Sequence, residues 1–470
     1  MKRIWVLALT LCVLLGISRI ATAHESPVIL TLDEALARVE YHSDYQAWES
    51  NWENSSKSIQ AILDKHSLAL DISGDLFSYR YNFERDKSDF STGPALSLSK
   101  SNLWGTNLSG SFSPKWNLSD GSVRSGWSLG LTQTLWPAPW FNSDQIALQT
   151  AYDTQAVLLK QRVYVVENTR FKIEKLYRTA QIAEARVSLA EAGLAAALRS
   201  QQVVEEKLGM GEAGEIDLIN SQLNVLRAER DLESGQAAAD AAKENLLQAV
   251  DLSGEFQLTS LDIGYLPEEE EDVDLEALLA KLHDHPLVLQ HQVELKKAEL
   301  ELEAGQAASK PEASLSIRLQ DSSQSGTSGQ GAGPSFVASV SIGYPILDKN
   351  QWSSTLETLS DNLEKARSAY EQALEQVERL FRETAQEVAG LARDVQIASL
   401  TLRQAELEWQ AAQLQYEAGL IDHSSLVNAE VRLKQAELDY YESMFNYSWT
   451  KRRLNRGLVG ELSGAGGQIR

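Results

Sequence analysis

The sequence predicts a protein of mixed α and β structure in which a short helix, a set of strands and two long helices occur twice in tandem. Three observations support this fold class. A heptad pattern of apolar residues runs from Gln351 to Tyr416, the same pattern occurs 208 residues earlier, and alternating apolar and polar residues precede both patterns. The 470 residues are 43% hydrophobic, which is the composition of a folded protein.

The heptad pattern contains no proline and one glycine, Gly390. At 1.5 Å per residue it predicts a rod of about 100 Å, interrupted by one extra four-residue step after Val377. Eleven positions from Phe381 to Tyr416 have counterparts 208 residues earlier, and ten of these counterparts are apolar. The counterparts are Ile173, Leu176, Ala180, Ala183, Val187, Ala190, Leu194, Ala197, Gln201, Val204 and Leu208.

In the first copy, the segment from Thr31 to about His66 is predicted to be helical, with a capped start at Thr31-Leu32-Asp33-Glu34. Four candidate strands lie between Leu68 and Trp136. The apolar phase reverses by Phe77, which predicts a β-bulge or a change of facing. The long helix that follows ends at about Leu208.

Both long helices end near a glycine, Gly211 in the first copy and Gly419 in the second, as a left-handed helix cap requires. A second helix then begins and extends to Val250 in the first copy and to Leu458 in the second. Either Asp422 or Ser424 is suited to cap the helix that follows Gly419.

The second copy begins after an acidic spacer and repeats the plan with fewer strands. A helical stretch from Leu275 to about Ser309 precedes two alternating runs, 313–319 and 336–346, joined by the polar loop Gln320 to Ser335. The domain boundaries are therefore a signal peptide at 1–23, a first repeat at 24–264, an acidic linker at 265–274, a second repeat at 275–460 and a flexible tail at 461–470.

The N-terminus predicts export by a cleaved signal peptide, because the basic start Lys2-Arg3 precedes an apolar run and the cleavage site Ala21-Thr22-Ala23. The only cysteine, Cys12, falls within this segment, and Leu11 before it is not the small residue that lipoprotein processing prefers. No later uncharged apolar stretch reaches about 18 residues. The net charge of −23 argues against a nucleic-acid partner.

The predicted strands have the pattern of a barrel wall with lipid outside and water inside, since their apolar residues alternate with Ser, Gly, Asn, Lys and Arg. Five of the eleven Trp lie between Trp104 and Trp140, as expected for interfacial belts. The alternative is a soluble β-sandwich with exposed aromatic residues. Four or six strands do not close a barrel alone, so a symmetric homo-oligomer is expected. Six strands are counted, and four would remain if two form an extended extracellular hairpin.

No catalytic, cofactor or metal site is predicted. The histidines at His283, His285 and His291 are read as part of a polar helix end, because no cysteine or organised carboxylate is spaced with them. The sequence contains no nucleophile motif, phosphate loop or paired-acid constellation, so no enzymatic activity is expected.

Taken in order, these features resemble the TolC-like outer-membrane efflux proteins over nearly the whole mature chain. The resemblance rests on the tandem repeat, the Glu-Ala-Leu starts at Glu34 and Glu276, the strand-to-helix junctions at Gln133 and Tyr344, and the turn Tyr416-Glu417-Ala418-Gly419-Leu420. It implies a homotrimer with an outer-membrane β-barrel continuous with a long periplasmic α-helical barrel, in the outer membrane of a Gram-negative bacterium.

The resemblance also implies a function and partners. The trimer would be a passive exit duct for small molecules or polypeptide, working with a periplasmic adaptor (membrane fusion) protein and an inner-membrane transporter in tripartite efflux or type I secretion. The adaptor would dock at two turns, which here contain Met210, Gly211, Ala418, Gly419 and Leu420; Glu212 departs from the usual apolar residue.

The family's periplasmic gate has two carboxylate rings, and the matching positions here are the uncharged residues Ser425 and Asn428. Asp217 stands opposite Ser425 in the first copy, and Tyr416 matches a tyrosine of the closed gate. These four residues are gate candidates, with helix capping as the alternative role for the polar ones. The alternative function for the whole chain is a soluble periplasmic coiled-coil scaffold or adaptor, although an adaptor would have one central helical hairpin instead of two.

Overall fold

The computed structural model describes residues 28–82, 87–118, 121, 123–137, 142–252, 254, 256–262, 272–322, 334–344 and 349–460. The predicted signal peptide, the tail at 461–470, the junction at 345–348 and most of the acidic linker and of the loop 320–335 lie outside these residues. The described chain divides into two compact units. We call them the hairpin unit (residues 1–43, 169–269 and 390–449) and the sheet unit (residues 44–168, 270–389 and 450–470). Each unit contains parts of both sequence repeats.

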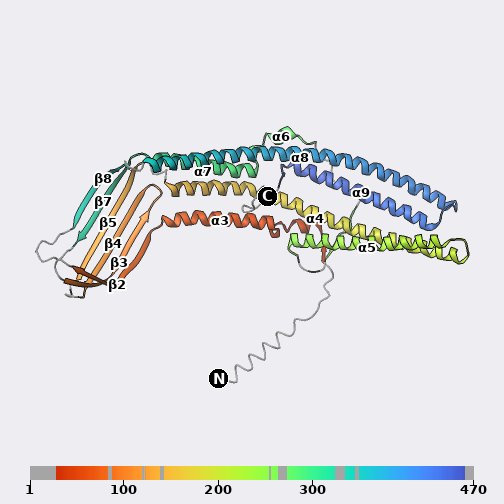
Figure 1. The fold of residues 1–470 in the computed structure, drawn as a ribbon, viewed down its shortest axis with the longest axis horizontal. Helices are drawn as coiled ribbons and strands as arrows, with labels where there is room; N and C mark the ends of the chain where they lie inside the picture. The colour runs from red at the N-terminus through yellow and green to blue at the C-terminus, as the bar shows by residue number, and fades with distance from the viewer. Residues whose placement is uncertain are drawn as a thin grey trace, which may run out of the picture. The chain divides into compact units, whose positions relative to one another are not determined.

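The sheet unit is built on one antiparallel sheet of six strands in the order β2-β3-β4-β5-β7-β8 (Figure 1). The strands are β2 (Ala69–Asn82), β3 (Lys87–Ser101), β4 (Thr106–Asn117), β5 (Val123–Trp136), β7 (Glu312–Ser322) and β8 (Ser335–Gly343). The four predicted strands of the first repeat and the two of the second are thus confirmed. The predicted phase reversal is also confirmed, since the β2–β3 register shifts between Asp75 and Ser78.

Helices attach to the sheet at one end of its strands (Figure 1). They are α3 (Ser43–Lys65), the first part of α4 (Ser143–Gly209), α7 (Pro286–Ala308) and the first part of α8 (Lys349–Glu417). Trp48 of α3 donates its indole N–H to the carbonyl of Leu158 at 2.9 Å, and Lys296 of α7 lies 2.6 Å from Asp153 of α4. These contacts join α3 and α7 to α4, and Gly305 of α7 lies close to Leu359 of α8.

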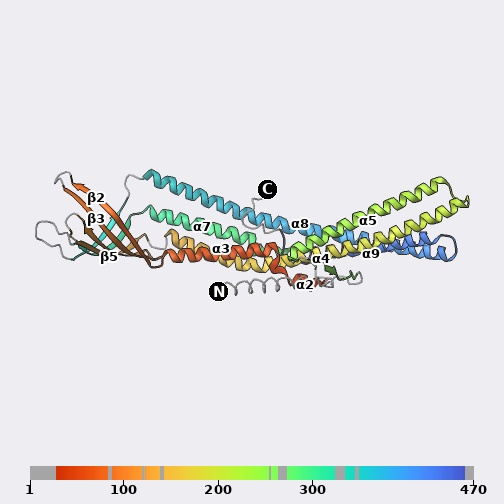
Figure 2. The same ribbon diagram turned by 90° about the horizontal axis from the view of Figure 1, so that it is seen from below.

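The hairpin unit contains two antiparallel helical hairpins (Figures 1 and 2). The end of α4 pairs with α5 (Glu215–Val250), and the end of α8 leads into α9 (His423–Asn455). Lys243 of α5 and Glu184 of α4 form an ion pair at 2.6 Å, while Arg186 of α4 reaches Glu442 of α9 at 2.5 Å. The Arg186 contact shows that the two hairpins pack against each other.

The predicted heptad seam forms the packed side of both long helices. None of the eleven seam positions on α4 is exposed, and on α8 every position from Trp352 to Ala412 is buried or half-buried. Val377 and Phe381, which flank the extra four-residue step, are both nearly fully buried. The seam in each copy is therefore a true packing stripe, and only Tyr416 at its end is exposed.

Three details of the fold differ from the sequence prediction. The stretch 31–66 is divided into α2 (Leu32–Leu36), a 3-10 turn (Val39–Tyr41) and α3, because His42 is extended. The stretch 275–309 is divided in the same way into α6 (Leu275–Leu279), a 3-10 turn (Leu282–Asp284) and α7. Helix α9 ends at Asn455 instead of Leu458, since Gly457 takes a left-handed conformation with φ of 70°.

Sequence patterns did not reveal a small parallel sheet of β1 (Val28–Leu30) and β6 (Phe256–Leu258). The buried Tyr177 of α4 fixes this sheet, because its hydroxyl donates to the carbonyl of Leu30 at 2.8 Å and lies 2.8 Å from the Thr259 hydroxyl. The sheet therefore joins the start of the described chain to the end of the first repeat.

Candidate functional site

The six-stranded sheet has one apolar face. Cross-strand register carries this face through the whole sheet, since Ile72 pairs with Leu96, Leu96 with Phe112 and Leu108 with Leu131. It continues through Leu131 with Ile317 and through Leu319 with Phe336. Many of these side chains are exposed in the single chain: Leu70, Ile72, Leu96, Leu108, Phe112, Leu129, Leu131, Leu319, Phe336, Val340 and Ile342.

The opposite face of the same sheet consists mainly of serine. Register places Asp71 opposite Ser97, Ser97 opposite Ser111, Ser111 opposite Ser128, and Ser314 opposite Ser341. Two of these pairs are joined by side-chain hydrogen bonds of 2.8 Å, Ser111 with Ser128 and Ser314 with Ser341. The sheet therefore separates an apolar surface from a polar surface that is rich in hydroxyl groups and also carries charged residues such as Asp71 and Arg318.

Aromatic residues border the apolar face at both ends of the strands. At the end away from the helices, Tyr79 stacks obliquely on Phe90 with ring centroids 4.9 Å apart, and Phe77 lies 5.4 Å from the same ring. At the helix end, Trp136 and Tyr344 are exposed. The arrangement is that of two aromatic belts flanking an apolar band.

The two hairpin turns have the same backbone structure. Gly211 and Gly419 take left-handed conformations, with φ of 76° and 73°. The amide of Gly211 bonds to the Leu208 carbonyl at 3.0 Å, and that of Gly419 bonds to the Tyr416 carbonyl at 2.9 Å. The glycine stops predicted from the sequence are confirmed. The docking-turn candidates are all exposed, with Met210 67% and Leu420 76% accessible.

The turns differ in the residue that caps the following helix. In the first turn of α5, Asp217 accepts a hydrogen bond from the Gly214 amide at 2.9 Å. Before α9, Asp422 accepts from the Ser425 amide at 2.9 Å and from the Ser424 hydroxyl at 3.0 Å. Asp422 is thus the cap of α9. Of the gate candidates, Asp217 and Ser425 do act in helix capping.

The hydrogen bonds that Asp422 accepts also affect its charge. Bonds from Ser425 lower the pKa of the Asp422 carboxyl, with smaller contributions from Ser424 and from the positive charge of Lys207, although partial burial opposes them. Lys207 lies on the other hairpin, at the end of α4. Acidic charge at the start of α9 is therefore carried by Asp422, three residues before Ser425.

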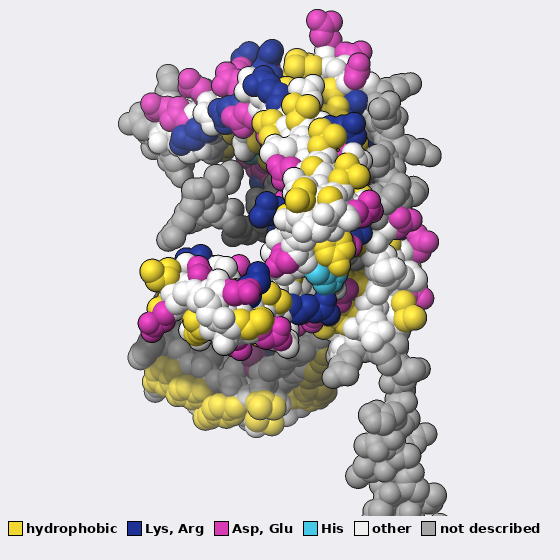
Figure 3. Space-filling view, turned by 90° about the vertical axis from the view of Figure 1, so that its right-hand side faces the viewer, with side chains coloured by type: hydrophobic (Ala, Val, Ile, Leu, Met, Phe, Trp, Pro, Cys, Tyr) yellow, Lys and Arg dark blue, Asp and Glu magenta, His cyan; other side chains and the backbone are white. Residues whose placement is uncertain are grey.

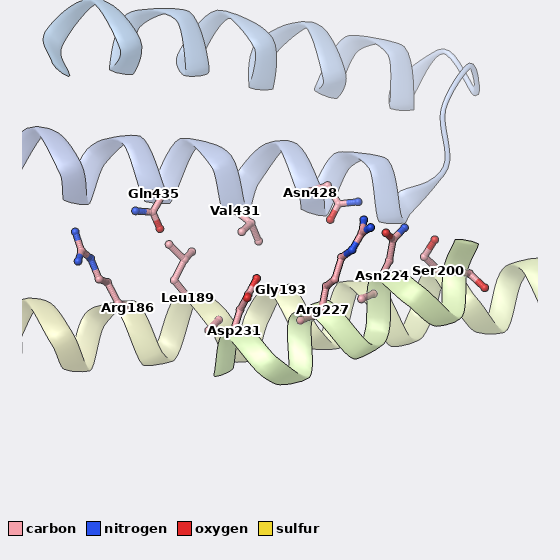
Figure 4. Close-up of a pocket in the computed structure, with 14 residues that line it drawn as sticks. Arg186, Leu189, Gly193, Ser200, Asn224, Arg227, Asp231, Asn428, Val431 and Gln435 are labelled. Carbon is pink, nitrogen blue, oxygen red and sulfur yellow. The ribbon is translucent and has the colours of Figure 1, made fainter. Parts of the chain in front are cut away.

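The remaining gate candidates lie in different surroundings. The Tyr416 ring lies 5.8 Å from the His423 ring across the turn and is 42% exposed. Asn428 borders a cavity of about 430 Å³ between α4, α5 and α9, where it points toward Arg227 (Figure 4). Arg186, Asn224, Asp231 and Gln435 also line this cavity, together with Leu189 and Val431, so its lining is mixed polar and apolar.

No single charged patch covers the end of the hairpins. Figure 3 views this end and shows hydrophobic, acidic and basic side chains interspersed over the turns. The exposed acids near the turns include Glu212, Glu215 and Asp217 in the first copy. The structure thus does not gather the four gate candidates into one cluster within a single chain.

A second apolar stripe, missed in the sequence, runs along each hairpin. On α8 it contains Ile397, Leu400, Leu407 and Leu414, which are 50 to 71% exposed and are spaced by three or seven residues. On α5 it contains Ile216, Ile219, Leu223 and Leu226, which are 44 to 75% exposed. Heptad spacing of exposed apolar residues indicates a helical partner outside this chain. The stronger buried seam had hidden this signal.

His283 and His285 contact neighbouring side chains and backbone. The buried His285 accepts a hydrogen bond from the Leu287 amide at 3.3 Å and lies between the rings of Tyr164 and Phe381. His283 lies 3.0 Å from the Tyr370 hydroxyl. Among the described residues, no group of three or more His, Cys, Asp or Glu is placed to hold a metal ion. None of the described helices has the length and hydropathy needed to cross a membrane.

Comparison with known proteins agrees with these features. Residues 280–455 match the family described as Outer membrane efflux protein. No curated protein sequence matches the chain. Among solved structures, CusC, studied for its folding and transmembrane channel formation, is 14% identical, with a TM-score of 0.66 over 93% of each chain.

Two further channels are similar in fold. The outer membrane channel CmeC of Campylobacter jejuni is 11% identical, with a TM-score of 0.65 over 91% of this chain and 86% of that one. The outer membrane protein VceC of Vibrio cholerae is 13% identical, with a TM-score of 0.62 over 91% and 95%. The second repeat thus carries the outer membrane efflux protein signature, the chain has the fold of these outer-membrane channels, and its resemblance to the TolC-like efflux proteins is confirmed.

Proposed function

We propose that the protein is the outer-membrane exit duct of a tripartite efflux or type I secretion system. Three copies surround one pore, through which small molecules or polypeptide leave the periplasm passively. The observation that carries this proposal is the two-faced sheet. An apolar face bordered by aromatic residues lies behind a serine-rich face, and the strands contribute alternate residues to both faces.

The sheet has the properties needed to cross a bilayer. A membrane-spanning strand needs about 9 to 11 residues, and the six strands have from 9 to 15. Lipid would cover the apolar face, which water would otherwise contact at Leu70, Ile72, Val340 and Ile342. The serine face would line a water-filled pore. Its hydroxyls bond to each other across strands, and Asp71, Lys115 and Arg318 add charges of both signs to the same face.

The exposed stripes on the hairpins support assembly with further copies. Exposure of the stripe Ile397, Leu400, Leu407 and Leu414 to water is unfavourable, and burial of these side chains against another helix would stabilise the assembly. The resemblance to the TolC-like proteins implies a trimer. In such a trimer, the stripes on α5 and α8 of neighbouring copies would close a wall of helices.

The turns are the proposed contact with partner proteins. Met210, Gly211, Ala418, Gly419 and Leu420 project at the hairpin ends and would dock a periplasmic adaptor, which connects the duct to an inner-membrane transporter. Asp217, Tyr416, Ser425 and Asn428 lie within one to three helical turns of them and are the proposed gate region. Asp422 supplies a charge there that the matching positions Ser425 and Asn428 lack.

Two neighbouring residues on β5 provide a direct test. Leu129 faces the apolar side and Ser128 the serine side. Arginine on a lipid-facing strand position costs about 2 to 4 kcal/mol at the middle of the membrane, whereas a pore-facing position tolerates it. We expect Leu129→Arg to reduce the amount of protein that resists carbonate extraction of membranes, and Ser128→Arg to leave it unchanged.

The same fractionation tests the alternative. The unmodified protein should stay with membranes in carbonate and require detergent for release as a trimer. Release by carbonate alone, or equal behaviour of the two arginine variants, would contradict the duct and favour a soluble periplasmic scaffold or adaptor.

A further inference from the structure

We propose that the free edge of β8 in one copy pairs with the free edge of β2 in the next, so that all six strands of each chain enter the barrel wall. This inference rests on the trimeric duct proposed above. Three chains then close an eighteen-stranded barrel, in place of the twelve strands that four per chain would give. The occupant of each edge is a second copy of this chain.

The first argument is that β2 and β3 belong to the wall. They are paired over twelve residue pairs, from Ala69 with Ser99 to Asn82 with Lys87, and β3 continues into β4 without a break in facing. Leu70 and Ile72 extend the apolar face beyond Leu96 and Leu98. An extracellular hairpin in water would have no reason to continue the lipid-facing surface. The open alternative of a four-stranded wall is therefore disfavoured.

The second argument is the state of the two edges. All nine residues of β8 are exposed, and its sequence contains no charged residue and no proline. Natural edge strands are usually protected by charge, proline, bulges or a covering element. β2 is also exposed from Ala69 to Phe77, and its regular part, Ala69–Asp75, precedes the bulge. Its length suits the short β8.

The third argument is geometric compatibility. The sheet is antiparallel throughout and has an even number of strands, so β8 of one copy and β2 of the next also meet antiparallel. The apolar faces of both edges are on the same side. Ser341 lies two residues before the end of β8, and Asp71 two residues after the start of β2. If the helix-side ends of the strands are level, Ser341 and Asp71 face each other on the pore side.

The number of strands sets the width of the pore. With strands about 4.8 Å apart and tilted by about 40°, eighteen strands give a backbone diameter of about 36 Å and twelve give about 24 Å. The expected difference is therefore about 1.5-fold. A wall of serines at the larger diameter would admit bulkier solutes through the outer membrane.

Disulfide cross-linking of the full-length protein in membranes tests the edge contact. Cross-strand neighbours lie within the Cα separation that a disulfide spans. The only cysteine, Cys12, lies in the predicted signal peptide, so the background is low. Ser341→Cys is combined in turn with Asp71→Cys, Ser73→Cys and Asp75→Cys on β2. The matched control series combines it with Asn107→Cys, Ser109→Cys and Ser111→Cys on β4.

We expect covalent dimers and trimers on non-reducing gels from at least one β2 pair, and none from the β4 series. The reverse result would overturn the inference, because β8 would then pair with β4 and the β2–β3 hairpin would stand outside the wall. Failure of all three β2 pairs in a protein that still forms trimers would also overturn it.

Electron microscopy of the detergent-solubilised particle gives an independent measurement. End views of the barrel should show a ring near the larger of the two diameters, and a ring 1.5-fold narrower would contradict the inference. These outcomes are distinct from failure of the duct itself. A protein released by carbonate rejects the proposed function, whereas an intact membrane trimer with a narrow barrel rejects only the edge pairing.

Discussion

The two repeats of the chain agree in backbone and differ in side chains and strands. Their turns match residue for residue, from the hydrogen bond of Gly211 or Gly419 to the left-handed φ at each glycine. Both place a buried histidine, His42 or His285, in extended conformation between a 3-10 turn and a long helix. Yet the first repeat contributes four strands to the sheet and the second contributes two.

The capping residues show how the side chains of the two turns differ. Gly214 and Asp217 occupy the same positions as Asp422 and Ser425. A complete capping box has an accepting side chain at the first position and a longer acid or amide side chain that reaches back from the second. Each repeat keeps one acid, at opposite ends of the box. One acid is enough to bond one free amide, so the position of the acid is free to vary while the backbone is held by glycine.

The largest expected effect comes from breaking a long helix. Ala398→Pro and its counterpart Ala190→Pro each remove a backbone donor in mid-helix, at a cost of about 3 kcal/mol or more per protomer. If both hairpins are equally necessary, both variants should abolish trimer formation on native gels. Ala398→Ser, which keeps the amide, should assemble normally, and normal trimer yield from either proline variant would contradict continuous helices.

A comparable loss of stability is expected at low pH, where His285 becomes protonated. Burial lowers the pKa of His285 to about 4, below the usual 6.5, because the charged imidazole is poorly solvated between Tyr164 and Phe381. The contribution of neutral His285 to the free energy of unfolding is fully present above about pH 6.5. It is lost as the pH falls toward 4, by about 3 kcal/mol in total.

The His285→Asn variant separates this charge effect from capping. Asparagine keeps a side-chain acceptor for the Leu287 amide but does not titrate. Thermal unfolding in detergent, at fixed protein concentration between pH 7 and pH 4, should show a smaller loss of stability in the variant. An unchanged pH dependence would mean that other groups dominate acid unfolding.

Substitution of the glycine at either turn should destabilise the protein to a similar extent. An added Cβ at Gly211 or Gly419 meets no atom within 4 Å, so the cost of Gly→Ala is the left-handed backbone alone, about 1 to 2 kcal/mol at each. Gly390 lies within α8 and is equally open, so Gly390→Ala should stabilise the helix by about 0.5 to 1 kcal/mol. Unfolding temperatures of the three variants check both the size and the opposite sign.

The smallest expected effect concerns the caps. Asp217→Ala and Asp422→Ala should each cost about 0.5 to 2 kcal/mol. For Asp422 this contribution is present at neutral pH and is lost in acid, because its folded-state pKa is lowered and protonation removes the charge that Ser425 and Ser424 bond. Ser425→Asp should restore part of the box in the second repeat. Stability equal to that of the parent would show that one acid already satisfies the turn.

Much of this architecture was predictable because its signals are long. Long heptad seams and strands such as Val123–Trp136 repeat their pattern often enough to predict the type of secondary structure and the face that carries the apolar residues. Even the bulge near Phe77 was visible as a reversal of the alternation between apolar and polar residues. The three-residue strands Val28–Leu30 and Phe256–Leu258 repeat nothing, so they were missed. They depend on the side chain of Tyr177, whose contact with Leu30 spans 147 residues.

The candidate site was less predictable for a related reason. The glycines of both turns could be identified, since only glycine takes the left-handed conformation readily. The residue that caps α9 could not be predicted from the sequence. Asp422 and Ser424 are both suited to cap a helix, and only the folded turn distinguishes them. The exposed stripe on α8 was hidden because the stronger seam on the same helix accounts for most of its apolar residues.

The uncharged edge strand β8 has a consequence for how the protein is made. A chain exported in the way proposed above would carry this edge, and the apolar face beside it, through an aqueous compartment before any partner copy is present. Such an edge accepts any extended segment, including one from an unrelated protein. We therefore expect newly exported chains to depend on periplasmic chaperones until they assemble, and chains without a partner copy to be removed by proteolysis.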